Sequence, residues 1–544
     1  MWLPAKSSSS RETVSIATAS TSERYPRPAP SAARQDPYTS LVRVDTTGGV
    51  VEGVLRRGLR MWRGIPYAAP PVGSLRFRAP APVVAWTGIR DARDFGAVAP
   101  QDRKGQFLGP ATHVPIAEDC LTLNVIAPAE GMDLPVMVWV HGGAYAVGSS
   151  REIRHQGEVL VRGGVIFVSM NYRLGALGFL DFSSFSTDER LFEPNLGLRD
   201  VVASLEWVRD NIRNFGGDPN NVTMFGESAG ANAVTTLLTV PSARGLFVRA
   251  IAQSAPANAI YPAEVTAVWA REYVELLSEV VDNSSTDSTS PEDAGAVLAA
   301  ASIDDLVTAT TRMQLLTPDR HPGTIALCPV IDGEFLPERP LDAFKAGRAH
   351  PVPLTIGTND REGSLFRGRL DILATTPSRI RAIFAKTRKR SRKALKALYP
   401  GLPDRRSAAD FGGDYAFWYP SVKVAERHSK FAPVHVYRFD IAPRLARMAG
   451  YDATHGLELF ALFDRMDGTF GRVMGALGGR RAFKRAGVRM QRNWVRFAND
   501  GSLEAWPKYN SRSRRTLIID SVDRVEKDPR GDRRRAWQDF VPHI

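Results

Sequence analysis

The sequence has few of the features that mark secreted or membrane-spanning proteins. Its 544 residues include only two cysteines, Cys120 and Cys328, which favours a reducing compartment, and a cytoplasmic location is therefore expected. Because no apolar run approaches the ~18 residues of a membrane-spanning helix, no transmembrane segment is expected. Residues 1–40 are rich in Ser, Thr, Ala, Pro and Arg and lack the apolar stretch of a secretory signal. They are predicted to be a disordered extension.

Acidic residues are fewer than basic ones, 58 against 71, and the formal net charge is +13. Many of the cations lie in residues 379–396 and in the tail at 533–535. No RNA-recognition, zinc-finger or helix-turn-helix pattern accompanies them, so nucleic acid is not expected as a partner. The basic segment 379–396 is predicted to be a solvated helix face. The alternative is a weak contact with anionic lipid or with an acidic partner.

What the chain does contain is a repeated alternation of short apolar runs and helical patterns. Residues 198–215 have the spacing of an amphipathic helix, and buried strands are predicted at 134–140, 165–170, 222–225, 250–253, 352–356 and 434–439. This alternation predicts an α/β fold with a doubly wound, mostly parallel sheet flanked by helices. Residues 41–544 are predicted to form a single domain, with helical insertions near 260–315 and 365–430 that cap the sheet and build a substrate pocket.

The pentapeptide Gly226–Gly230 (Gly-Glu-Ser-Ala-Gly) follows one of these strands and precedes a run that can be helical. That setting is typical of a nucleophile elbow, in which the glycines permit a sharp turn between strand and helix. Ser228 is therefore the candidate nucleophile. The alternative is a chance match in a loop.

An activated serine needs a base, and the base needs an orienting carboxylate. In the order expected downstream of Ser228, His455 is the candidate base, because it lies in a small-residue turn before an apolar helix. Asp360 and Glu362, in a turn after a predicted strand, are both candidates for the acid. The small residues of His141–Ala144 follow an early strand, as an oxyanion loop requires.

Further motifs make the chain resemble the type-B carboxylesterases, the cholinesterase-like branch of the α/β-hydrolases that includes bacterial para-nitrobenzyl esterases. The resemblance covers roughly residues 41–540 and rests on the elbow and on motifs at residues 64–77, 118–125, 171–174 and 215–219. It implies an α/β-hydrolase fold. It also implies hydrolysis of a small-molecule carboxylic ester through a Ser-His-Glu triad and an acyl-enzyme.

Residue by residue, the resemblance makes Ser228 the nucleophile, His455 the general base and Glu362, rather than Asp360, the acid. No metal or organic cofactor is implied. The resemblance further assigns oxyanion donors at Gly143, Ala144 and Ala229, with Gly142 in the same loop, an acidic neighbour of the nucleophile at Glu227, and a hydrogen-bond partner of the acid at Ser254.

One departure concerns the cysteines. The family commonly pairs the cysteine that matches Cys120 with an earlier one, where this chain has Ala99. Cys120 is therefore predicted to be a free, buried thiol, and Cys328 has no obvious partner.

The motifs leave the substrate open. Soluble esters of short to medium chain are expected, with lipase, carbamate or amide hydrolysis on the same triad as alternatives. A non-catalytic adhesion relative is a further alternative, although such relatives typically lack the serine. The side chains predicted to line the pocket, or else to belong to the core, are Tyr145, Phe366, Phe417 and Trp418. The oligomeric state is not predicted.

Overall fold

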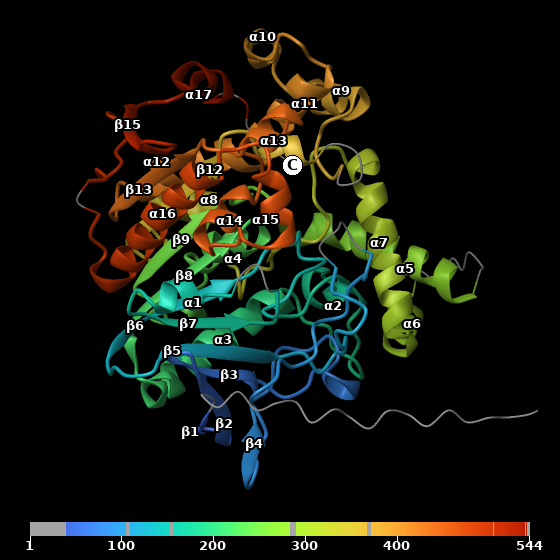
Figure 1. Cartoon of the computed structure of the whole chain (residues 1–544). Coiled ribbons are helices and arrows are strands. Elements are labelled where there is room, and N and C mark those ends of the chain that lie inside the picture. Colours follow the sequence, from blue (N-terminus) through green and yellow to red (C-terminus); the bar gives the residue numbers. More distant parts are fainter. Residues whose placement is uncertain are drawn as a thin grey trace, which may run out of the picture. The chain divides into compact units, whose positions relative to one another are not determined.

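The predicted strands assemble into one large sheet with a parallel centre (Figure 1). The computed structural model describes residues 40–104, 109–152, 156–282, 290–366, 371–503, 505–538 and 540. The predicted extension at residues 1–40 lies outside them except for Ser40, and the described residues from Ser40 onward form one compact unit.

The strands of the sheet are β1 (Ser40–Thr46), β2 (Gly49–Arg56), β3 (Leu59–Pro66), β4 (Ile89–Asp91), β5 (Thr122–Pro128), β6 (Leu134–Val140), β7 (Ile166–Met170), β8 (Gly217–Glu227), β9 (Arg249–Gln253), β12 (Leu354–Asn359), β13 (Val434–Phe439), β14 (Arg515–Ile519) and β15 (Arg524–Lys527). Their order is β1-β2-β3-β5-β7-β6-β8-β9-β12-β13-β14-β15, and β4 pairs with β2. The strands from β7 to β14 in this order pair in parallel, and antiparallel pairs flank them. The predicted doubly wound, mostly parallel α/β sheet is confirmed.

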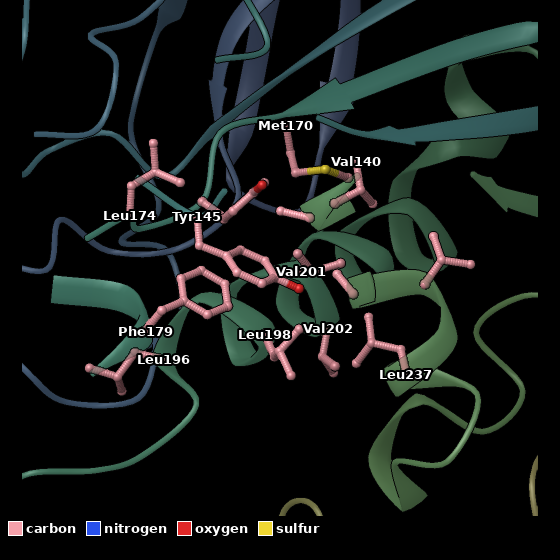
Figure 2. Close-up of a cluster of buried hydrophobic side chains, with 14 of the residues drawn as sticks. Val140, Tyr145, Met170, Leu174, Phe179, Leu196, Leu198, Val201, Val202 and Leu237 are labelled. Atoms are coloured by element: carbon pink, nitrogen blue, oxygen red, sulfur yellow. The ribbon is translucent and has the colours of Figure 1, made fainter. Parts of the chain in front are cut away.

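The central strand β6 is apolar throughout because both of its faces are covered. Successive side chains of a strand point to opposite faces. Val138 belongs to a buried cluster with Val201 of α3 (Leu196–Asn211), whereas Trp139 belongs to a second cluster with Trp494 of α16 (Arg480–Asp500). Figure 2 shows part of the first cluster, which includes Val140 of β6 and Val201 of α3. A continuous apolar strand is what such two-sided burial requires.

The helix predicted at residues 198–215 is present, but it begins earlier and its last turn is a 3₁₀ turn. α3 runs from Leu196 to Asn211, and one 3₁₀ turn continues it over Ile212–Phe215. Gly216, with a φ of 95°, ends the turn in the left-handed region that glycine adopts readily.

The order of the strands creates a crevice at one edge of the sheet. From β6 the chain passes through α1 (Glu158–Val161) to β7 on one side, and from β8 through α4 (Ala229–Leu237) to β9 on the other. Connections that diverge in this way leave a gap at the carboxyl ends of the two strands, where ligands bind in open α/β sheets. The loop after β6 and the elbow after β8 both begin at this point.

Helices fill the two segments predicted as caps (Figure 1). The first contains α5 (Ala263–Asp282), α6 (Pro291–Ala300) and α7 (Ile303–Arg320), and the second contains α9 (Pro377–Ala385), α10 (Lys389–Leu398), α11 (Arg405–Gly413), a π-helical turn (Asp414–Trp418) and α12 (Tyr419–His428). The remaining helices are α2 (Ala176–Phe179), α8 (Pro340–Ala346), α13 (Arg444–Met448), α14 (Leu457–Leu462), α15 (Thr469–Met474) and α17 (Gly531–Gln538), and β10 (Tyr261–Pro262) pairs with β11 (Val330–Ile331).

Cys120 is free and buried, as predicted, and Cys328 is also free and buried. Burial raises the pKa of each thiol. Within the described ranges, no helix combines the length and the apolar character needed to cross a bilayer.

Candidate active site

Ser228 occupies a strained turn between β8 and α4. Its φ of 57° and ψ of −122° are unfavourable for a residue with a Cβ. The turn is tight enough that a Cβ on Gly226 would lie 2.6 Å from the carbonyl carbon of Gly230, and one on Gly230 would collide with the carbonyl oxygen of Val140. The Ser228 N–H donates to the carbonyl of Gln253 at 2.9 Å, which ties the elbow to β9. The two glycines of the motif are therefore needed for packing, and the serine stands at the start of a helix.

The loop after β6 lies directly against the elbow. A Cβ on Gly142 would lie 3.1 Å from the Cβ of Ser228. Gly143 has a φ of 117°, and Ala144 has a φ of 53°. Because a Cβ on Gly143 would collide with the carbonyl oxygen of Val147, this position requires glycine. The backbone of this loop thus passes close to Ser228.

Ala229 is the first residue of α4. The N–H groups of a first helical turn have no partner within the helix, and the helix dipole is positive at this end. The start of α4 therefore presents N–H groups and positive dipole charge beside Ser228.

His455 and Glu362 are brought together from elements 93 residues apart in the chain. Glu362 begins a short 3₁₀ turn (Glu362–Leu365) after β12, and its Oε2 lies 2.6 Å from Nδ1 of His455. Its other oxygen, Oε1, accepts from the Ser254 hydroxyl and from the Asn359 N–H, each at 2.6 Å. The carboxylate is thereby fixed by three contacts in a buried position.

Asp360, the other candidate for the acid, faces away from the histidine. Its carboxylate pairs with Arg530 at 2.6 Å and lies 3.6 Å from Arg438. Only Glu362 has the geometry of an orienting acid.

A second carboxylate faces the other ring nitrogen of His455. Oε1 of Glu227 lies 3.2 Å from Nε2, so the imidazole is placed between two acidic side chains. Burial lowers the pKa of His455, but Glu227 and Glu362 outweigh it, and the pKa lies above its ordinary value. Burial also raises the pKa of Glu227. This arrangement stabilises an imidazolium at the site.

A third carboxylate was not singled out in the sequence. Glu458, on α14, is fully buried and accepts hydrogen bonds from the side chains of Asn359 and Gln253. Gln253 is itself held by the indole N–H of Trp494 at 3.0 Å. Burial raises the pKa of Glu458. Its only signal in the sequence is a lone carboxylate in an apolar helix, three residues after His455.

Of the four side chains predicted to line a pocket or to belong to the core, two lie against His455. The rings of Phe417 and Phe366 are centred 4.3 Å and 5.2 Å from the imidazole of His455. Tyr145 instead stacks on Phe179 in the core shown in Figure 2, with ring centroids 3.8 Å apart. Trp418 lies beneath the guanidinium of Arg530.

A cavity with a volume of about 260 Å³ lies among the described residues. Its wall includes Ala146 and Val147, which follow β6, together with residues of α2, α7 and α9, but neither Ser228 nor His455. In the described part of the chain, no group of three or more His, Cys, Asp or Glu side chains has the arrangement of a metal site.

Comparison with known proteins relates this geometry to a family. The sequence model of the Carboxylesterase family matches residues 40–537. The para-nitrobenzyl esterase of Bacillus subtilis is 36% identical over 498 residues, which cover 90% of this chain and 97% of that protein. The fumonisin B1 esterase of Sphingopyxis macrogoltabida is 34% identical over 498 residues, covering 89% and 87%.

Solved structures agree. A structure of a PNB esterase superposes with a TM-score of 0.79 at 35% identity, covering 91% of this chain and 99% of the other. The carboxylesterase of Geobacillus stearothermophilus gives a TM-score of 0.76 at 31% identity, covering 91% and 100%.

Proposed function

Since this chain belongs to the carboxylesterase family and is a carboxylic ester hydrolase, we propose that it cleaves soluble esters of short to medium chain through Ser228, His455 and Glu362. The observation that supports this assignment best is the fixed carboxylate of Glu362 on Nδ1 of His455, next to a serine in a strained elbow. These are the parts of a nucleophile–base–acid triad.

In the proposed mechanism, Nε2 of His455 takes the proton of Ser228 as the hydroxyl oxygen bonds to the ester carbonyl carbon. The oxyanion is held by the N–H groups of Gly143, Ala144 and Ala229. The carbon–oxygen bond of the ester then breaks, and the alcohol leaves with the proton from His455. Water repeats the sequence on the acyl-enzyme and releases the acid.

The side chains around the triad are proposed to hold it ready. Glu362 keeps Nδ1 protonated and stabilises the imidazolium, while Ser254 and the Asn359 N–H orient the carboxylate. Gly142 lets the oxyanion loop approach the elbow closely. Glu227, on the Nε2 side, adds negative charge where the imidazolium forms.

The test is hydrolysis of para-nitrophenyl esters of increasing acyl length by the wild type and Ser228→Ala. Loss of the nucleophile is expected to lower kcat by roughly 10⁴- to 10⁶-fold. Ser278→Ala is the matched control, because this buried serine lies on α5 away from the triad and its loss is expected to leave kcat unchanged. Full turnover by Ser228→Ala would contradict the proposal.

The same series separates the alternatives. The apolar rings of Phe366 and Phe417 beside His455 support an apolar acyl or alcohol group of limited size. A lipase would prefer long chains above their solubility limit, whereas the proposed esterase turns over short soluble chains best. Carbamates and anilides of the same acyl length test the other two alternatives.

We also propose a single catalytic domain over residues 41–544, acting in the cytoplasm. The free, buried Cys120 and Cys328 support a reducing compartment. A variant starting at residue 40 should retain full activity, and a loss of activity would assign a role to the extension.

The basic segment 379–396 is proposed to make a weak contact with an anionic surface. Lys389, Arg390, Lys393 and Lys396 on α10 are exposed and support it. Arg379 does not, because its buried guanidinium pairs with Asp319 and Asp371. Retention on heparin that falls as salt is added tests this contact.

A further inference from the structure

Exposed apolar side chains lie on α13, on α15 and on the segment that follows α15, near the loop that carries His455. These side chains, here called the α13–α15 patch, are Met448, Phe470, Val473 and Leu477, which are 74%, 58%, 55% and 49% exposed. Large apolar side chains that are exposed together mark interaction sites, whereas single ones are ordinary.

The two helices, α13 and α15, are in contact with each other, and both lie near α14 in Figure 1. The N–H of Arg444, at the start of α13, donates to the carbonyl of Gly478 after α15 at 3.2 Å. The ring of Phe470 on α15 packs on Phe460 of α14, with centroids 5.1 Å apart. The patch is joined to the site by the chain itself, because residues 449–456 connect α13 to His455 and α14, and the carbonyl of Tyr451 accepts the hydroxyl of Ser364 at 2.6 Å.

Three exposed arginines, Arg444, Arg447 and Arg472, lie on the same two helices. Among the described residues, none of the three has a carboxylate within salt-bridge distance. The nearby acids are already neutralised by other cations: Asp467 pairs with Arg480 and Lys484, Asp464 with Lys484, and Asp452 with Arg361 and Arg406. The two helices that carry the patch therefore also carry uncompensated positive charge.

We propose that the α13–α15 patch docks on an anionic lipid surface. The arginines would pair with lipid phosphates while the apolar side chains enter the boundary between headgroups and acyl chains. A second copy of this chain fits less well, because a two-fold interface would place the same arginines against one another. Docking involves residues separate from segment 379–396 and is independent of the catalytic assignment.

The experiment is co-sedimentation of the full chain with vesicles of phosphatidylcholine alone or with about one third phosphatidylglycerol. We expect binding to the anionic vesicles only. The triple variant R444Q/R447Q/R472Q should bind roughly 100-fold more weakly, since each cation near such a surface contributes severalfold. Met448→Asp with Val473→Asp should also lose binding. The matched control, Met132→Asp with Val84→Asp, changes two exposed apolar residues far from α13 and α15 in the sequence and should bind as the wild type does.

Hydrolysis of a soluble para-nitrophenyl ester by each variant shows that it is folded, and should stay at the wild-type level. Failure of the proposed triad is distinguishable, because sedimentation is read without catalysis and can be repeated with Ser228→Ala. Equal binding of the wild type and both patch variants would overturn the proposal, as would no binding to anionic vesicles. Self-association that is lost in Met448→Asp with Val473→Asp, without vesicle binding, would assign the patch to a second copy instead.

Discussion

Two buried groups of charged side chains differ in how their charges balance. Arg173 and Asp200 form a bidentate pair with N–O distances of 2.6 and 2.8 Å, and the third guanidinium nitrogen, Nη1, donates to the carbonyl of Arg78. The charges cancel, and each guanidinium nitrogen donates a hydrogen bond. Around His455, by contrast, three carboxylates surround one titratable base, and their excess raises its pKa. The balanced pair fixes a loop to α3, whereas the unbalanced group is poised to change its protonation state.

We predict that substitutions of the carboxylates around His455 change the catalytic rate. Substitutions of Arg173 or Asp200 should instead change the stability of the fold. The largest effect is expected from Glu362→Gln, which keeps the shape of the acid but cannot hold the protonated Nδ1. kcat for para-nitrophenyl butyrate should fall by about 10⁴. Asp360→Asn is the matched control, two residues away and paired with Arg530. Similar losses in both variants would show that the turn, rather than the carboxylate of Glu362, matters.

Breaking the balanced pair should cost stability instead. Arg173→Met removes the positive charge that faces Asp200 and leaves this buried carboxylate only the main-chain N–H of residue 173, so it should lower the free energy of unfolding by about 3–5 kcal/mol. Urea unfolding measures it. Arg43→Met removes a pair whose arginine is largely exposed, and should change stability by less than about 1 kcal/mol. If kcat of the folded Arg173→Met enzyme fell as far as that of Glu362→Gln, the distinction between the two groups would fail.

A smaller, directional effect is expected from Glu227→Gln. Glu227 stabilises the imidazolium and so raises the pKa of His455, and the base works only when it is neutral. Activity of the wild type is therefore lost as the pH falls below this raised pKa. Removing one carboxylate lowers the pKa, so the acidic limb of kcat/KM against pH should move to lower pH. A limb that stays in place or moves upward would rule out this role for Glu227.

The smallest effect on kcat is expected from Glu458→Gln. Because burial raises the pKa of Glu458 above its unfolded value, the folded protein holds a proton that the unfolded chain releases, and this contribution to stability is lost as the pH rises through the folded pKa. The glutamine side chain has nearly the same shape as glutamate, but it does not bind or release a proton in this pH range. The variant should therefore gain stability over the wild type as the pH rises from about 5 to about 8 in urea unfolding.

Glu458→Ala tests the hydrogen bonds that Glu458 accepts. It leaves the side chains of Asn359 and Gln253 without their acceptor, and should lower stability by about 1–3 kcal/mol. A stability difference between Glu458→Gln and the wild type that does not change with pH would mean that Glu458 keeps one protonation state throughout.

Much of the fold, and the elbow around Ser228, could be predicted from short stretches of the sequence. The run at 134–140 matches β6 residue for residue, because a strand buried on both faces must be apolar throughout. The elbow around Ser228 could be predicted from the sequence because a side chain at Gly226 or Gly230 would collide with backbone a few residues away or on the adjacent strand, so the motif needs glycine at both positions. From the residues alone, however, Asp360 and Glu362 stayed equal candidates for the acid.

What the sequence by itself determined was the alternation of strands and helices, the elbow and the small-residue loop after β6, since each depends on backbone geometry over a short stretch. Only the tertiary structure decided which carboxylate faces His455, that Glu458 is buried beside it, and that Tyr145 belongs to the core. Those outcomes depend on partners from distant elements, such as Arg530 for Asp360 and Trp494 behind Gln253. The pKa of a side chain is set by such neighbours and by burial, and neither is written in the residues adjacent to it.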